Sequence, residues 1–324
     1  MRGKLTWILA LITLSFLIMG PVQARDWDQT VPAVWGSWVA WLEDSSGFVN
    51  VAVTKIGEKG KFYPDHVRAQ QGAPDMAGGL LVWQDRRDGY WQIYGWRPGS
   101  PRSYQLSYGR QEHINPATDG HTVVWQQDDN GFWDIYALKL KGRKLLRLTG
   151  ERARQENPDV DGEWVVWQDE RNGFWDIYAA NLATGEERRL TWERADQINP
   201  RISGDWVVWQ DERRGHWDIY AFNLKENREY RLTDDRCDQI NPVLDGNIVF
   251  WQDNRNGYWS VMGMDLSSGE RYDFGNFKAN QENPSVKEDK IFWQEERNGR
   301  WEIRGYDVKN KEWLSPATGF LQDN

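Results

Sequence analysis

The sequence predicts an all-β protein, a seven-bladed β-propeller with four antiparallel strands in each blade. Three observations lead to this prediction: a tryptophan recurs every 42 residues, apolar and polar residues alternate with a period of two, and turn dipeptides separate the short strands. Seven such repeats cover 294 of the 324 residues, from Gln29 to Gln322. We therefore expect a single propeller domain over residues 25–324.

The repeat is defined by two tryptophans and an upstream Gln and Asn-Pro. The first tryptophan follows apolar residues and anchors each copy: Trp41, Trp83, Trp125, Trp167, Trp209, Trp251 and Trp293. The second follows eight residues later in six copies: Trp91, Trp133, Trp175, Trp217, Trp259 and Trp301. Blades of a propeller pack face to face, so both series are expected to be buried between blades.

Four strands are expected inside one copy. In the fourth copy they cover residues 157–160, 164–169, 175–182 and 187–191, which are rich in β-branched and aromatic residues. Asn172-Gly173 is a hairpin signal, because both residues tolerate positive φ. Pro158 suits an innermost strand, where one edge faces the channel and needs no N–H. A solenoid of stacked strands is the alternative architecture, but the tight hairpins favour the propeller.

A family resemblance supports this architecture. The sequence D-x-R-N-G-x-W-D-I-Y at Asp169–Tyr178, followed by E-x-R-x-L-T from Glu187, resembles the WD-like propeller repeat of the TolB family. The resemblance covers all seven copies and implies the fold. It does not imply a function, because this repeat occurs in many unrelated proteins. TolB also carries an N-terminal domain that has no counterpart in these repeats, so no Tol–Pal role is implied.

The N-terminus has the layout of a secretory signal peptide. Arg2 and Lys4 precede an almost wholly apolar run from Leu5 to Met19, and small residues stand at Val22 and Ala24. We expect cleavage after Ala24, so that residues 1–24 are removed and the protein is secreted, periplasmic or held at the cell surface. An uncleaved membrane anchor is the alternative, although the apolar run is short for a spanning helix.

Charge and cysteine content exclude several classes of partner and stabilisation. The formal net charge of −9 argues against nucleic acid as a partner, because phosphate contacts need an excess of Lys and Arg. No later stretch is apolar enough to span a membrane. The single cysteine, Cys237, excludes an intramolecular disulfide. We expect the mature protein to be an ordered, acidic, monomeric domain.

Candidate site residues gather at one mouth of the predicted channel. In this strand order, the entry to the first strand and the second hairpin lie on the same face of the ring. The polar residues expected there are Asp85, Arg87, Asp169, Arg171, Asp211, Arg213, Asp253, Arg255, Arg297, Asn157, Asn199 and Asn241. The structural interpretation is that each Asp caps its turn or pairs with the neighbouring Arg. The alternatives are a binding surface, or a cation such as Ca²⁺ held by Asn and Gln carbonyls.

Aromatic residues follow the turn glycine in most copies and could contact a ligand. The candidates are Tyr90, Phe174 and Tyr258, with His216 in the fifth copy. The four histidines show no metal-ligand spacing, no catalytic motif is present, and no cofactor is expected. We therefore expect a non-catalytic, protein-binding or scaffolding propeller with a partner in the cell envelope or outside the cell. A carbohydrate-binding or carbohydrate-cleaving propeller that takes a polysaccharide is the alternative.

Overall fold

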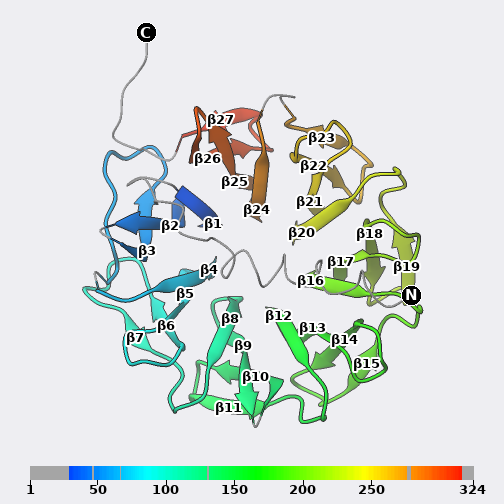
Figure 1. Ribbon diagram of the computed structural model, residues 1–324, viewed down its shortest axis with the longest axis horizontal. Coiled ribbons are helices and arrows are strands. Elements are labelled where there is room, and N and C mark those ends of the chain that lie inside the picture. The colour runs from blue at the N-terminus through cyan, green and yellow to red at the C-terminus, as the bar shows by residue number, and fades with distance from the viewer. Residues whose placement is uncertain (1–28, 46, 66, 130, 276–278, 316–324) are drawn as a thin grey trace.

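The chain folds into a ring of seven antiparallel sheets, as the repeats predict. The computed structural model describes residues 29–315 apart from 46, 66, 130 and 276–278. These residues contain 27 strands and no helix. The sheets stand as blades around a common centre, with one strand of each nearest to it (Figure 1). The predicted signal peptide, residues 1–24, lies outside the described residues.

Each blade is built from one uninterrupted repeat. The first three blades contain β1 (Gln29–Trp35), β2 (Trp38–Ser45) and β3 (Phe48–Lys55); β4 (Gln71–Ala77), β5 (Leu80–Asp85), β6 (Gln92–Trp96) and β7 (Tyr104–Gln105); and β8 (His113–Thr118), β9 (Thr122–Asp129), β10 (Phe132–Lys139) and β11 (Lys144–Arg147). The fourth and fifth contain β12 (Gln155–Asp161), β13 (Trp164–Asp169), β14 (Asp176–Asn181) and β15 (Glu187–Arg189), then β16 (Gln197–Ser203), β17 (Trp206–Asp211), β18 (Asp218–Asn223) and β19 (Arg228–Arg231). The sixth and seventh contain β20 (Gln239–Asp245), β21 (Ile248–Asp253), β22 (Ser260–Asp265) and β23 (Arg271–Asp273), then β24 (Gln281–Lys287), β25 (Lys290–Arg297), β26 (Arg300–Asp307) and β27 (Glu312–Leu314).

The first blade departs from the four-strand pattern. Its outermost strand is reduced to a single bridge, in which Val53 and Phe62 exchange backbone hydrogen bonds at 2.9 and 3.0 Å. Gly57 and Gly60 in the connecting segment have positive φ, and Pro64 follows the bridge. These residues turn the chain away from β3, so the pairing does not extend beyond the single bridge.

The outer strands are shorter than the repeat predicts, because side chains replace some of the backbone hydrogen bonds between strands. In the fourth blade the backbone N–H of Ile177 donates to the hydroxyl of Thr191 at 2.9 Å instead of to a backbone carbonyl. The N–H of Trp175 donates to the Asp196 carboxylate at 3.0 Å. The third strand therefore begins at Asp176 rather than at Trp175.

The anchor tryptophans form the core, as predicted. All seven, from Trp41 to Trp293, are at most 1% exposed. Each lies in a cluster that joins two neighbouring blades; Trp209, for example, packs with Val166 of the preceding blade. The expectation for the second series was wrong except at Trp175, which is 2% exposed and is covered by the Arg154 guanidinium at 4.9 Å. The other members are half-buried, and they lie at or just before the start of the third strand, beside the hairpin.

The Asn-Pro dipeptide marks a bulge in each innermost strand. Pairing between β12 and β13 slips between Glu156 and Asp159, which leaves Asn157 and Pro158 outside the ladder. Asn157 has a φ of 53°, in the left-handed region that asparagine tolerates better than most residues. Pro158 therefore costs no ladder hydrogen bond, as expected from its place on the channel side.

The ring closes without exchanging strands. The seventh blade takes all four strands from the last repeat, and β1 belongs wholly to the first. Side chains bridge the seam: the N–H of Val31 donates to Gln294 at 3.0 Å, and the N–H of Ile303 donates to Gln29 at 3.3 Å. Trp41 also packs against Phe292 across the same seam.

Candidate functional site

The candidate residues lie together at one end of the ring. We define the hairpin face as the end that carries the turn between the second and third strands of each blade and the linkers between blades. Gln155, at the start of β12, pairs directly with Asp169, at the end of β13. The predicted Gln-x-Asn and Asp-x-Arg groups therefore share one face of the ring.

The predicted Asp-x-Arg group forms a compact clasp in the fourth blade. The buried carboxylate of Asp169 accepts hydrogen bonds from the indole N–H of Trp167 at 3.1 Å and from the backbone N–H of Arg171 at 2.9 Å. The Nε of Arg171 donates to the same carboxylate at 2.9 Å, and its guanidinium lies 4.4 Å from the ring centre of Tyr178. Arg171 also donates to Glu187 at 2.9 Å. We call this arrangement the Asp–Arg clasp.

The clasp recurs around the ring. Equivalent pairs are Asp85–Arg87, Asp211–Arg213, Asp253–Arg255 and Glu295–Arg297. Burial alone would lower the pKa of Arg171, but the hydrogen bonds and negative charge of Asp169 raise it above its ordinary value. Each guanidinium is held by its own blade, which agrees with the structural interpretation of these residues. A role for them in binding stays a prediction.

A ring of amide side chains joins the blades beside the channel. Gln168 accepts a hydrogen bond from the side chain of Asn157 in its own blade and from the backbone N–H of Asn199 in the next, both at 3.0 Å. Asn157 also donates to the side chain of Asn199 at 3.0 Å, and Asn199 donates to Asn241 at 3.2 Å. The three predicted asparagines are therefore brought together, and their amide groups are used between blades.

The glutamine that completes this amide ring was expected on this face but was not among the candidate site residues. It follows the anchor tryptophan in six copies: Gln84, Gln126, Gln168, Gln210, Gln252 and Gln294. Leu42 stands in its place in the first copy. The signal was visible as an almost invariant polar residue inside a buried strand, a position that requires hydrogen-bond partners.

Aromatic side chains are the exposed apolar groups of the hairpin face. Tyr90, Phe174 and Tyr258 are 40%, 43% and 43% exposed, whereas His216 is half-buried, 3.5 Å from Asp218. Two further aromatics, which the sequence reasoning missed, lie in the linkers between blades: Tyr108 is 63% exposed and Trp192 is 64% exposed. Exposed aromatic residues of this kind are enriched at binding surfaces.

Two half-buried acids of the innermost strands, Asp159 and Asp75, are not part of the Asp–Arg clasps. Desolvation raises the pKa of Asp159 to about 6, with the negative charge of Asp75 acting in the same direction and Arg201 opposing it. The carboxylate of Asp159 accepts the backbone N–H of Ile202 in the next blade at 2.9 Å, and Asp75 accepts that of Thr118 at 2.7 Å. These acids therefore also connect neighbouring blades. No group of three or more His, Cys, Asp or Glu residues suited to a metal ion occurs in the described part of the chain.

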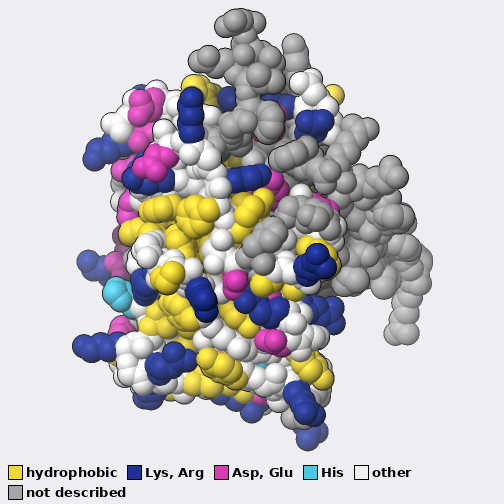
Figure 2. Space-filling model, turned by 90° about the vertical axis from the view of Figure 1, so that its left-hand side faces the viewer, with side chains coloured by type: hydrophobic (Ala, Val, Ile, Leu, Met, Phe, Trp, Pro, Cys, Tyr) yellow, Lys and Arg dark blue, Asp and Glu magenta, His cyan; other side chains and the backbone are white. Residues whose placement is uncertain are grey.

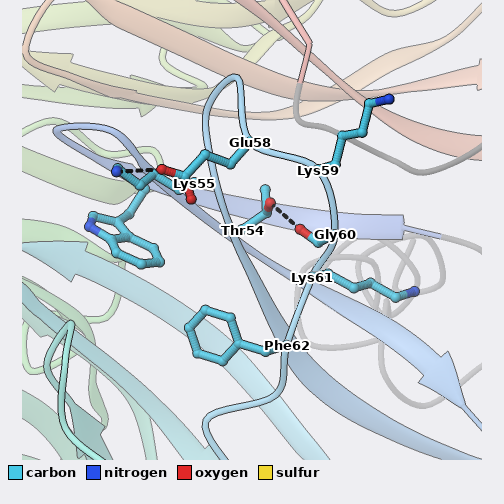
Figure 3. A pocket seen from close by; sticks show the side chains of 8 residues that line it. Thr54, Lys55, Glu58, Lys59, Gly60, Lys61 and Phe62 are labelled. Carbon is cyan, nitrogen blue, oxygen red and sulfur yellow. Dashed lines mark hydrogen bonds and ion pairs between the residues drawn. The ribbon is translucent and has the colours of Figure 1, made fainter.

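The reduced first blade leaves an apolar area on the outer wall of the ring. Figure 2 shows hydrophobic side chains gathered in the middle of this wall, with Lys and Arg around them. Phe62 is 40% exposed here and packs edge-on against Trp38 and Trp96, with ring centres 6.0 and 5.3 Å away. Beside it lies a hollow of about 220 Å³, where Thr54 donates to the Gly60 carbonyl (Figure 3).

Comparison with known proteins identifies the fold. A structure of TolB from Acinetobacter baumannii is similar at a TM-score of 0.55 and 15% identity, over 73% of this chain and 62% of that chain. The fold is that of a TolB-like β-propeller. No family model matches this chain, and no curated protein sequence matches it. No helix long and apolar enough to cross a membrane occurs among the described residues.

Two enzymes contain similar propellers. A puromycin hydrolase mutant complexed with PGG matches at a TM-score of 0.73 and 12% identity, over 93% of this chain. That match covers only 55% of the hydrolase. An oligogalacturonate lyase in complex with manganese matches at a TM-score of 0.64 and 10% identity, over 87% of this chain and 86% of that chain. At these identities the comparisons establish the fold alone.

Proposed function

We propose that this chain is an exported, monomeric, non-catalytic propeller that binds a protein partner of the cell envelope through the hairpin face. The observation that carries the proposal is the exposure of Tyr90, Phe174 and Tyr258 on the hairpins, together with Tyr108 and Trp192 on the linkers. Rigid aromatic side chains lose little entropy on binding and supply much of the energy at protein interfaces.

The distribution of charge on the same face supports this proposal. The acids of the Asp–Arg clasps are buried and already hydrogen-bonded within their own blades. A ring of near-identical, internally satisfied carboxylates lacks the unique asymmetric constellation that catalysis requires. The clasp acids are therefore already used within their blades, whereas the aromatic side chains at the rim are exposed to a partner.

A carbohydrate ligand is the second candidate, and the same aromatic side chains favour it. Flat, exposed rings also stack on apolar faces of sugars. The similar propeller of an oligogalacturonate lyase shows that a ring of this shape occurs in a protein that acts on a polysaccharide fragment. The proposed protein partner and this alternative use one face and differ in the ligand.

The decisive experiment captures partners from an envelope extract of the source cells with the purified mature protein. We expect a variant with Tyr90→Ser, Phe174→Ser and Tyr258→Ser to bind the captured protein at least about tenfold more weakly, because hot-spot aromatics contribute about 2 kcal/mol or more. Leu145→Ser, at an exposed position of β11, is the matched control and should bind normally.

Two outcomes would contradict the proposal. Equal capture by the rim variant and the native protein would exclude this face as the binding surface. Capture of no protein, together with rim-dependent binding on a glycan array, would replace the protein partner with the carbohydrate alternative. Changing the clasp arginines to Glu is a poor test, because Arg171 and Arg213 hold buried carboxylates and their loss would disturb the hairpins.

A further inference from the structure

The seventh blade differs from the fourth and fifth blades at two contacting positions. Arg304 pairs with the anchor Trp293 in the way that Tyr178 pairs with Trp167. Trp313 occupies the position that Glu187 holds in the fourth blade. Compared with the fourth blade, this site has thus lost a negative charge and gained a positive one. The sixth blade also departs from this pattern, with Met262 and Arg271 at the two positions, so the repeat does not require Tyr and Glu there.

Arg304 has no carboxylate or hydrogen-bond acceptor of its own among the described residues. No hydrogen bond or ion pair involves its side chain within the described residues, and its Nε is buried without an acceptor. The nearest carboxylate of the clasp is already used: Glu295 accepts from Arg297 at 2.6 Å and from Gln281 at 2.9 Å. Desolvation and the positive charge of Arg297 lower the pKa of Arg304. A guanidinium remains charged under such conditions, so an added anion would stabilise it.

These side chains line a pocket between the sixth and seventh blades. The pocket has a volume of about 300 Å³. Phe274 and Gly275 of the sixth blade form one wall, and Arg304 with Trp313 of the seventh forms the other. Trp313 is 56% exposed, and the guanidinium of Arg304 lies 5.3 Å from its ring centre. The volume is at the lower end of the range for small-molecule sites.

We propose that this pocket binds a small organic monocarboxylate, whose carboxylate pairs with Arg304 while its carbon skeleton packs against Trp313. The guanidinium offers parallel N–H donors that match the two oxygens of a carboxylate. Asp273 and Glu295 also line the pocket, so a doubly charged phosphate or sulfate ester is disfavoured relative to a single carboxylate. This proposal does not depend on the proposed function of the hairpin face.

Calorimetry with two pairs of probes tests the proposal. Benzoate and glucuronate carry a carboxylate on a flat or sugar skeleton, and benzamide and glucose are their uncharged counterparts. We expect at least one carboxylate to bind the native protein at millimolar concentrations and its counterpart to bind at least about tenfold more weakly. The preferred skeleton distinguishes an aromatic or peptide-like acid from a sugar acid, and either supports the proposal.

Two variants that restore the pattern of other blades should abolish binding while keeping the fold. Arg304→Tyr introduces the residue found at this position as Tyr178, and Trp313→Glu supplies an internal carboxylate like that of Glu187. The control is Arg188→Met, because Arg188 also lies over a tryptophan, Trp164 at 5.1 Å, but already pairs with Glu186. Unchanged carboxylate binding in Arg304→Tyr, equal binding of the neutral probes, or no binding of either carboxylate would overturn the proposal.

Discussion

Several carboxylates of this protein are buried between blades, where their protonation is linked to folding. Glu156 is 8% exposed in the inner strand of the fourth blade. Desolvation raises its pKa to about 7, and the negative charge of Glu170 adds to this while Arg154, 3.9 Å away, opposes it. The fifth and sixth blades have Ile198 and Ile240 at the same position. Glu156 is thus a buried acid at a position that is apolar in those two blades.

We predict that Glu156→Gln stabilises the protein at alkaline pH. The folded state keeps a proton on Glu156 that the unfolded chain releases between about pH 4.5 and 7, so the acid destabilises the fold as the pH rises through this window. The free energy of unfolding of the variant should exceed that of the native protein by about 2 kcal/mol above pH 7. Near pH 4 the two should be equal. Urea unfolding across this pH range measures the difference. A constant gain at every pH would contradict the assignment to this ionisation.

At the scale of the element, each innermost strand contains a bulge at its Asn-Pro position. Asn199 combines two roles there: its φ is 56°, and its side chain donates to Gln210 and Asn241. Val31 and Ala73 occupy the same position with φ of 51° and 46° in the first two blades. The strained conformation is therefore imposed by the blade, and asparagine is the residue that suits it best.

Two substitutions at Asn199 should separate these roles. Asn199→Gly keeps the positive φ without strain and removes only the side-chain hydrogen bonds. We therefore expect its free energy of unfolding to fall by about 1 kcal/mol. Asn199→Ala also places a side chain with Cβ in the left-handed region and should lose about 1 kcal/mol more. Chemical denaturation measures both variants. Equal stability of the two would show that backbone strain contributes little at the bulge.

The strands and turns were predictable from the sequence because the same pattern of strand and turn residues occurs in all seven copies. Trp167 and Asn172-Gly173 define their strand and hairpin without knowledge of the neighbours. The exposure of the second tryptophans was not predictable in this way, because it depends on which side chain of the adjoining linker covers each ring, as Arg154 covers Trp175. The pocket at Arg304 was accessible in principle, by reading each repeat position across all copies for the residue that breaks the pattern.

At the scale of the whole molecule, the seam between the first and last blades is the one joint without a covalent linker. Gln294 accepts from Asn283 in its own blade at 2.9 Å and from the N–H of Val31 across the seam at 3.0 Å. Gln210 makes the corresponding pair of bonds at an internal joint, to Asn199 and Asn241. The two glutamines thus make matching hydrogen bonds, but only the internal joint also has a side-chain hydrogen bond, from Asn199 to Asn241, because Val31 stands at that position across the seam. The seam also lacks chain continuity.

We predict that Gln294→Leu opens the ring locally. The loss of two hydrogen bonds should reduce the free energy of opening at the seam by about 1–2 kcal/mol, because no linker holds the separated blades. Amide hydrogen exchange should then accelerate in β1 and β24 ahead of the other blades. Gln210→Leu is the matched control, and we expect it to lower global stability without selective exchange. The same exchange pattern in both variants would rule out a special weakness of the seam.

The assignment of one uninterrupted repeat to each blade makes the seam equivalent in architecture to every other joint. If the present ends were joined and the chain were cut at another interblade linker, each blade would still form from consecutive residues. Cuts in exposed linkers are the kind of change that folded domains tolerate. The protein should therefore accept circular permutation at any of its blade boundaries, with the position of the opening moving around an otherwise unchanged ring.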